Sequence, residues 1–203
     1  MTTSSQQAIE AQLAQTEEEL RHCQEKIVQL RRQLNKPAVR DYTFNGPGNT
    51  RVPLSSLFGK HEDLIVIHNM GQGCNYCTLW ADGFNGVLPH LQDRAAFVVI
   101  SPDEPATQAD YARERGWKFK MLSSQGTTFR ADMGFQSDSE VLPGVSVFHK
   151  DAAGTITHVA HDVFGPGDNY CAVWHLFDLL PQGDNGWEPK RRYDDTSLPA
   201  VSL

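Results

Sequence analysis

The amino-acid sequence predicts an α/β fold in which helices flank a mixed central sheet, preceded by a long N-terminal α-helix. Three observations lead to this class. Apolar residues recur every three or four positions over residues 5–35, as in a long helix. Two β-branched runs, residues 64–67 and 95–100, are each followed by helical spacing, and a strand, a hairpin, a second strand and a helix come after them. A βαβ unit followed by ββα combines parallel and antiparallel strands in one sheet.

The N-terminal helix carries a heptad repeat with two core positions. Leucine or isoleucine fills every a position: Leu13, Leu20, Ile27 and Leu34. The d positions also contain Thr and Cys: Ile9, Thr16, Cys23 and Leu30. Pro37 ends the helix, because the residue before a proline avoids the helical region. The 3.5-residue period predicts a coiled-coil homodimer. The alternative is an amphipathic helix that lies on its own domain.

The chain divides into residues 1–36, the N-terminal helix; 37–182, one α/β domain; and 183–203, an irregular polar tail. Within the domain, the expected strands are residues 41–44, 52–54, 64–67, 95–100, 121–122, 142–148 and 155–160, of which 64–67 and 95–100 are the most strongly apolar. Turn clusters at residues 45–49 and 151–154 join neighbouring strands. Apolar residues at helical spacing predict a helix over residues 79–91. Further helices are expected over residues 105–115 and 168–180, with a helical turn at 127–133.

Composition excludes several classes of partner. A length of 203 residues suffices for one well-buried domain plus an appendage. The net charge of −7 argues against nucleic acid and against anionic membrane surfaces. No stretch approaches the ~18 apolar residues of a membrane helix. Residues 1–15 lack the basic and apolar regions of a secretory signal, so we expect a cytoplasmic protein.

The motif Cys74-Asn75-Tyr76-Cys77 follows a predicted buried strand and opens a predicted helix. Cys74 would therefore lie at the helix N-terminus, where unpaired N–H groups and the helix dipole favour a thiolate. Cys77, one turn later, is close enough to form a disulfide with it. One attacking thiolate and one resolving thiol are the groups that thiol–disulfide exchange requires.

A zinc site is the alternative interpretation of this cysteine pair. The chain has four cysteines, and no second Cys-x-x-Cys motif is present, because Cys23 and Cys171 stand alone. Histidines could complete a zinc site only if His68, or the pair His158 and His161, converged on the motif. The position of the motif between a strand and a helix favours redox chemistry.

Four further residues have two interpretations each. Arg130 either stabilises a thiolate or forms a surface ion pair with Asp132. Asp82 is either a buried proton acceptor for Cys77 or a polar surface residue. Cys171 is either a third redox thiol or a buried, inert cysteine. Pro143, at the entry of a predicted strand, cannot donate a hydrogen bond there and is either functional or an ordinary turn residue.

These features together resemble the thioredoxin superfamily, in its peroxiredoxin-like branch. The residues that carry the resemblance are the cysteine motif, Pro143, the final helix, and the segments 42–44, 46–48 and 52–59. A largely uncharacterised bacterial thioredoxin-like family is more similar still, through the segments 31–34, 80–84, 115–119, 123–124 and 177–181. The resemblance spans about residues 15–193. It implies that Pro143 is a cis-proline opposite the cysteines, with flanking backbone that pairs with a substrate chain.

Three departures from the resemblance concern the site. Gly71-Gln72-Gly73 precedes Cys74, where thioredoxins have Trp. Gly71 also occupies the offset at which peroxiredoxins place a Thr, so peroxidase activity is not expected. Gly144 follows Pro143, where Thr is usual, and this changes the substrate-pairing surface.

The sequence therefore predicts a thiol–disulfide oxidoreductase with Cys74, Cys77 and Pro143 in its site. Its substrate would be a disulfide-containing protein or a small thiol, and we expect neither a cofactor nor a bound metal. The alternative is a non-catalytic thioredoxin-fold module that binds a metal or a protein partner.

Overall fold

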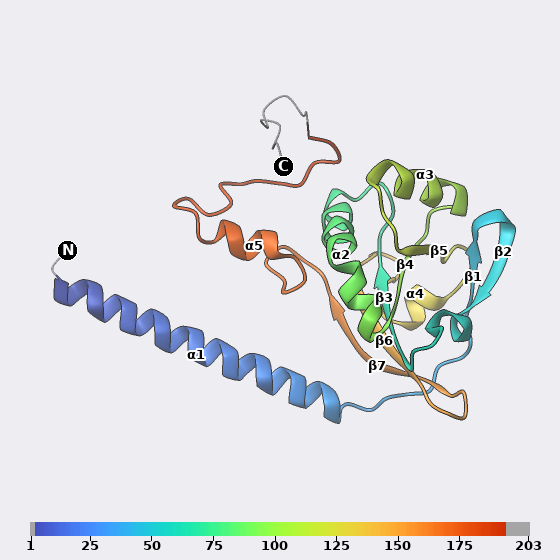
Figure 1. Cartoon of the computed structure of the whole chain (residues 1–203), viewed down its shortest axis with the longest axis horizontal. Helices are drawn as coiled ribbons and strands as arrows, with labels where there is room; N and C mark the ends of the chain where they lie inside the picture. Colours follow the sequence, from blue (N-terminus) through green and yellow to red (C-terminus); the bar gives the residue numbers. More distant parts are fainter. Residues whose placement is uncertain (1–2, 194–203) are drawn as a thin grey trace. The chain divides into compact units, whose positions relative to one another are not determined.

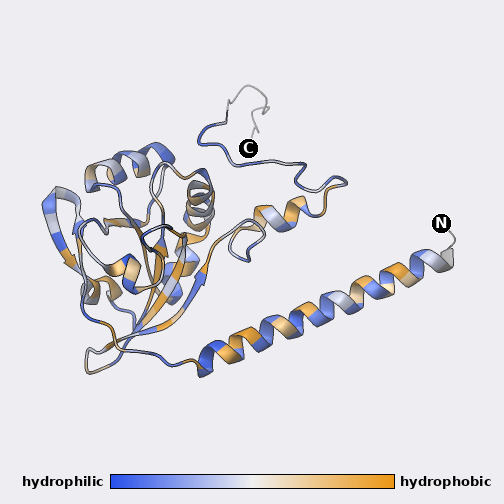
Figure 2. Cartoon of the chain, turned by 180° about the vertical axis from the view of Figure 1, so that it is seen from behind, coloured by the Kyte–Doolittle hydropathy of each residue, from blue (hydrophilic) through white to orange (hydrophobic). Residues whose placement is uncertain are grey.

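The structure is a computed structural model that describes residues 3–193. It divides into two units, residues 1–37 and 38–203, which we describe separately. The first unit consists of the helix α1, Thr3–Gln33. Its last turn contains Arg31 and Arg32, whose positive charges interact favourably with the negative end of the helix dipole. The leucine and isoleucine side chains of the heptad repeat are exposed, from 47% for Ile9 to 59% for Leu34, which directly follows the helix. Apolar and polar segments alternate along α1 in Figure 2.

The second unit is built on one seven-stranded mixed sheet (Figure 1). The strands lie in the order β2-β1-β5-β4-β3-β6-β7. Their bounds are β1 Thr43–Gly46, β2 Thr50–Pro53, β3 Asp63–His68, β4 Ala96–Ser101, β5 Lys120–Ser123, β6 Gly144–Lys150 and β7 Ile156–Val163. The strands β3, β4 and β5 run parallel, whereas β6 is antiparallel to both β3 and β7. The predicted mixed sheet is confirmed.

Helices cover both faces of the sheet. They are α2 Asn75–Arg94, α3 Pro105–Arg115, α4 Phe129–Asp132 and α5 Ala172–Phe177, with 3₁₀ turns η1 Pro47–Asn49 and η2 Leu54–Phe58. On one face, α2, α3 and α5 enclose a cluster that includes Trp80, Tyr111 and Trp174. On the other face, η2 and α4 enclose a cluster that includes Phe58 and Phe129. The sheet strands contribute residues to both clusters, as expected for strands buried on two faces.

The final helix is shorter than the predicted 168–180, because side chains hold the chain in a turn before it. The carboxylate of Asp168 accepts hydrogen bonds from the N–H groups of Gly165 and Tyr170, at 3.1 and 2.8 Å. Such local side-chain bonds compete with the helical ladder, and α5 begins only at Ala172. No helix within residues 3–193 combines the length and apolar character required to cross a membrane.

Candidate active site

Cys74 is the N-cap residue of α2, as its position after β3 predicts. Its backbone is extended, and its Sγ accepts a hydrogen bond from the N–H of Cys77 at 3.1 Å. The N–H of Cys74 donates to Gly71 O at 3.1 Å, which closes the turn that leads into the helix. Cys74 is half-buried and Cys77 is buried. The thiol of Cys74 thus occupies the place where helix N-termini stabilise negative charge.

The two thiols have opposite pKa shifts. A hydrogen bond from the Cys77 side chain, together with backbone N–H groups of Cys77 and Tyr76, lowers the pKa of Cys74 to about 7, although burial opposes this shift. The hydrogen bond to Cys74 and burial raise the pKa of Cys77. A thiolate is the nucleophilic form of cysteine. The geometry therefore favours the thiolate form of Cys74 and the protonated form of Cys77.

The loop between β3 and α2 is fixed by its own hydrogen bonds. The Met70 N–H donates to the Sγ of Cys77 at 3.4 Å, and the Gly71 N–H donates to Oδ1 of Asn69 at 2.7 Å. The Gln72 N–H donates to Oδ2 of Asp103 at 2.9 Å. The N–H groups of three consecutive loop residues therefore all have hydrogen-bond acceptors inside the protein.

Asp103, in the loop after β4, is a site residue that the sequence analysis missed. Its carboxylate lies so near Gly71 that a Cβ on Gly71 would be 2.8 Å from Oδ1. Gly71 also has a φ of +106°, which side chains rarely adopt. Both constraints explain why Thr does not stand at this position. The Asp103 contact joins loops far apart in sequence, so no local pattern indicated it.

Arg130 is a buried cation behind the cysteines. It lies on α4 and is only 2% exposed. Its Nη1 donates to Asn69 O at 2.5 Å and its Nη2 donates to Leu142 O at 3.2 Å. Its charge partly offsets the raised pKa of Cys77. Arg130 thus links the loop before Cys74 to the segment before Pro143.

The predicted alternative for Arg130, an ion pair with Asp132, is wrong. The carboxylate of Asp132 instead accepts hydrogen bonds from Arg40 at 2.9 Å and from the Tyr42 hydroxyl at 2.8 Å. Arg130 points inward from the same short helix, so the two residues have separate partners. Within the described residues, Nε of Arg130 has no hydrogen-bond partner.

Pro143 lies beside the end of β3, because the following residue, Gly144, pairs with His68 in the sheet. The expected cis peptide bond is wrong: residues 3–193 contain none, so Pro143 is trans. The neighbouring backbone groups are bonded inside the protein. The Leu142 N–H donates to Phe135 O at 3.0 Å, and Pro143 O accepts from the Phe164 N–H at 2.9 Å. The backbone on both sides of the trans peptide bond is therefore hydrogen-bonded to other segments of the protein.

Gly144 replaces the usual Thr for a steric reason. A Cβ at this position would be 2.2 Å from Cε1 of Phe135 and 2.3 Å from the backbone oxygen of Asp162. Real Cβ contacts are not that short, so no side chain fits between β6 and its neighbours without displacement.

Asp82 does not serve Cys77. Its carboxylate accepts hydrogen bonds from Arg115 and, at 2.8 Å, from Nε1 of Trp117. The hypothesis of a buried proton acceptor is therefore wrong. Cys171 is buried just before α5, and burial raises the pKa of its thiol. This environment is that of an unreactive cysteine.

The histidines do not converge on the cysteines. His68 is fully buried, and its Nε2 lies 2.9 Å from the Ser146 hydroxyl. Burial is the main reason that its pKa is far below the ordinary value, so the ring is neutral. His158 and His161 stack on each other with ring centroids 5.4 Å apart. Among the described residues, no group of three or more Cys, His, Asp or Glu side chains is placed to hold a metal ion.

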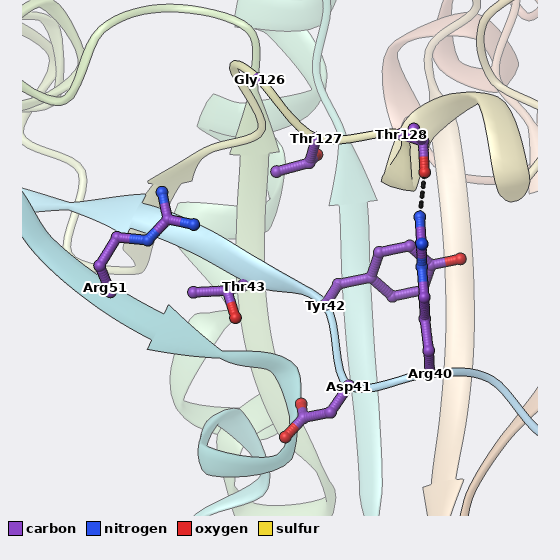
Figure 3. A pocket seen from close by; sticks show the side chains of 8 residues that line it. All are labelled: Arg40, Asp41, Tyr42, Thr43, Arg51, Gly126, Thr127 and Thr128. Carbon is purple, nitrogen blue, oxygen red and sulfur yellow. Dashed lines mark hydrogen bonds between the residues drawn. The ribbon is translucent and has the colours of Figure 1, made fainter.

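A separate pocket of 360 Å³ opens between β1, β2 and the loop before α4 (Figure 3). Its lining contains none of the cysteine-site residues: Arg40, Asp41, Tyr42, Thr43, Arg51, Gly126, Thr127 and Thr128. Arg40 is paired with Asp132, and the Asp41 carboxylate accepts hydrogen bonds from the N–H and hydroxyl of Ser55. With these charges already bonded, we assign no ligand to this pocket.

Solved structures with a similar fold include peroxiredoxins. Reduced Prx3 from Vibrio vulnificus, in complex with H₂O₂, is 11% identical with a TM-score of 0.54, over 66% of this chain and 90% of that one. Peroxidoxin BcpB from Mycobacterium tuberculosis is 23% identical with a TM-score of 0.50, over 68% of this chain and 88% of that one. At these identities the similarity shows the thioredoxin-like fold alone.

A search of curated proteins finds no match. The family model described as "Bacterial protein of unknown function (DUF899)" matches residues 2–196. The protein therefore belongs to this bacterial family.

Proposed function

We propose that the protein is a thiol–disulfide oxidoreductase in which Cys74 attacks and Cys77 resolves. The observation that carries the proposal is the contrast between the two thiols at the start of α2. Cys74 is half-buried with a pKa lowered to about 7, whereas Cys77 is buried with a raised pKa. Attack requires an accessible thiolate, and resolution requires a second thiol within reach.

The reaction has two steps. In the first, the Cys74 thiolate attacks one sulfur of a disulfide, whose S–S bond breaks; a mixed disulfide forms, and the departing thiolate takes up a proton. In the second, Cys77 loses its proton and attacks Cys74 Sγ, which releases the second thiol of the substrate. The substrate disulfide gains two electrons and becomes two thiols, while the protein gains a Cys74–Cys77 disulfide. A dithiol reductant then returns the protein to its starting state.

Arg130 supports the second step as a positioning residue. When Cys77 loses its proton, the negative charge develops near the buried guanidinium, which favours the charged form of this thiol. Its hydrogen bonds to Asn69 O and Leu142 O also fix the backbone on both sides of the site.

The first experiment is the reduction of a model disulfide in the presence of dithiothreitol. Cys74→Ser should abolish turnover. Cys77→Ser should accumulate a mixed disulfide that mass spectrometry detects. Cys171→Ser, which removes a buried thiol with a raised pKa, is the matched control and should turn over like the wild type. A wild-type protein that reduces no disulfide and forms none would contradict the proposal.

The alternative role, a non-catalytic module that binds a metal or protein partner, makes a different prediction for the same thiols. Zinc that survives dialysis and protects Cys74 and Cys77 from alkylation would support it. A metal-free protein whose Cys74 alkylates rapidly near pH 7 would exclude a zinc site.

We further propose a cytoplasmic location, where a reducing environment keeps the pair available as thiols.

A further inference from the structure

We propose that the substrate of Cys74 is a low-molecular-weight disulfide rather than a disulfide within a protein chain. The inference rests on the proposed thiol–disulfide exchange and narrows its substrate class. Two independent observations support it: the backbone groups beside the cysteines are already bonded, and residues 187–193 contact the loop before α2.

A polypeptide substrate that binds in extended form beside a sheet or loop gains its affinity from backbone hydrogen bonds. Next to Pro143, the candidate groups for such bonds are used internally. Leu142 donates to Phe135 O and accepts from Arg130, and Pro143 O accepts from Phe164. The following residue, Gly144, is paired within the sheet on both sides.

The opposite side of the site, residues 70–72, is bonded in the same way. The three N–H groups donate in turn to Cys77 Sγ, Asn69 Oδ1 and Asp103 Oδ2. A substrate chain would have to break several of these bonds before it could form its own. Each buried group left without a partner costs about 1–3 kcal/mol.

The C-terminal segment adds a steric restriction. We call residues 187–193 the strap. Trp187 packs against Phe177 and Trp174, with ring centroids 5.0 and 6.3 Å away. Pro189 is buried. These contacts anchor the start of the strap on α5, although no helix or strand forms within it.

The end of the strap is anchored on α3 and reaches the loop before Cys74. The Arg191 backbone oxygen accepts a hydrogen bond from Arg115 at 3.0 Å, and its guanidinium lies 4.9 Å from the ring centre of Tyr111. Nη2 of Arg191 also lies 3.5 Å from Oε1 of Gln72. Arg192 pairs with Glu114 at 2.7 Å.

The strap therefore contacts the loop before Cys74 directly, and it reaches Tyr76 through Trp174. Gln72, two residues before Cys74, contacts Arg191. The ring of Tyr76, two residues after Cys74, lies 6.1 Å from the ring of Trp174, which in turn packs against Trp187 of the strap. Burial raises the pKa of Tyr76, and the negative charge of Glu188 raises it further. A folded protein must bring chain to both sides of its disulfide, where these segments already lie. A small disulfide needs only access to the half-buried Cys74 sulfur.

The test compares two substrates of the same reduced protein. Bis(2-hydroxyethyl) disulfide is the small substrate and insulin is the protein substrate. The rate of Cys74–Cys77 disulfide formation is followed by acid quench, alkylation and mass spectrometry. We expect the wild type to be oxidised by the small disulfide and to react with insulin at least about tenfold more slowly, a difference of about 1.4 kcal/mol in activation free energy.

Variants of the strap measure how much it contributes to the preference for the small disulfide over insulin. Arg191→Ala removes the contacts with Gln72 and Tyr111, and Trp187→Ala removes the anchor on α5. Either change should lower the ratio of the small-disulfide rate to the insulin rate. Arg191→Ala keeps the apolar anchor, so it tests the strap even if Trp187→Ala unfolds. Arg113→Ala removes an exposed ion pair with Asp110 on the same α3 and is the matched control.

The outcomes are distinguishable. A wild type that reacts with insulin as fast as with the small disulfide would overturn the inference and leave the exchange chemistry intact. An unchanged ratio in both strap variants would overturn the role of the strap. If neither disulfide oxidises the wild type or any variant, the proposed function itself fails, and the substrate class fails with it.

Discussion

The Cys77 side chain is the largest influence on the acidity of Cys74. Its hydrogen bond lowers the pKa of Cys74 to about 7. The alkylation rate of Cys74 by iodoacetamide should therefore rise with pH and reach half its maximum near pH 7, because only the thiolate reacts. Cys77→Ala removes this hydrogen bond and should move the midpoint upward, toward about 8.5 for a free thiol. The measurement is the rate of Cys74 alkylation, followed by peptide mass.

Cys77→Ser is the matched control for this prediction, because a hydroxyl can still donate to Cys74. Its midpoint should stay closer to that of the wild type than the midpoint of Cys77→Ala does. Equal midpoints in the two variants would show that the backbone N–H groups alone set the acidity of Cys74.

Arg130 makes a second prediction at the residue scale. Arg130→Met keeps much of the side-chain volume but leaves Asn69 O and Leu142 O without their donor. Since each buried polar group without a partner costs about 1–3 kcal/mol, we expect urea unfolding to show a loss of roughly 2–6 kcal/mol for the two carbonyl groups. Arg94→Met removes an exposed ion pair with Asp63 and should cost no more than about 1 kcal/mol. Similar losses in the two variants would contradict the bracing role of Arg130.

How far the sequence predicts single residues depends on the range of their contacts. The position of Cys74 at a helix N-terminus follows from its neighbours in the chain, and the structure places it there. The inward direction of Arg130 was one of two alternatives, because helical spacing alone did not decide which face is buried. Asp103 was missed because its partners, Gly71 and Gln72, belong to a loop about 30 residues earlier.

At the scale of elements, the pairing of β6 depends on the missing side chain of Gly144. Gly144→Ala places a Cβ against Phe135 and the Asp162 backbone, so we expect a loss of roughly 1–3 kcal/mol in the free energy of unfolding. Gly86→Ala is the control, because a Cβ there meets nothing within 4 Å and Gly86 lies inside α2. That variant should gain about 0.5–1 kcal/mol. Denaturant unfolding of both variants measures the difference, and an unaffected Gly144→Ala protein would contradict the steric argument.

The elements themselves were predicted well where hydrophobic patterns are strong. The buried strands β3 and β4 appear within one residue of the expected runs, because β-branched residues buried on two faces leave few alternatives. The last helix and the geometry of Pro143 were predicted less well. Asp168 side-chain bonds delay α5, and the segment around Pro143 is held by Arg130 and Phe164, which lie elsewhere in the sequence.

At the scale of the whole molecule, α1 presents a row of apolar side chains that its own unit leaves uncovered. Leu13 and Leu20 are each 57% exposed, and Ile27 is 47% exposed. Helices of this amphipathic kind gain most of their stability from packing against a partner. The strict heptad spacing of these residues matches a left-handed coiled coil, so we propose that a second copy of α1 covers them.

The corresponding prediction concerns the mass in solution. Light scattering should give twice the 22.7 kDa chain mass, and deletion of residues 1–36 should give a monomer. Leu20→Asp places a charge in the apolar seam and should also give a monomer, whereas Glu19→Asp, just outside the seam, should leave the dimer intact. In a parallel, in-register dimer, the exposed Cys23 would face Cys23 of the partner, so mild oxidation should add a disulfide between the chains. A full-length protein with the mass of one chain would contradict the proposed dimer.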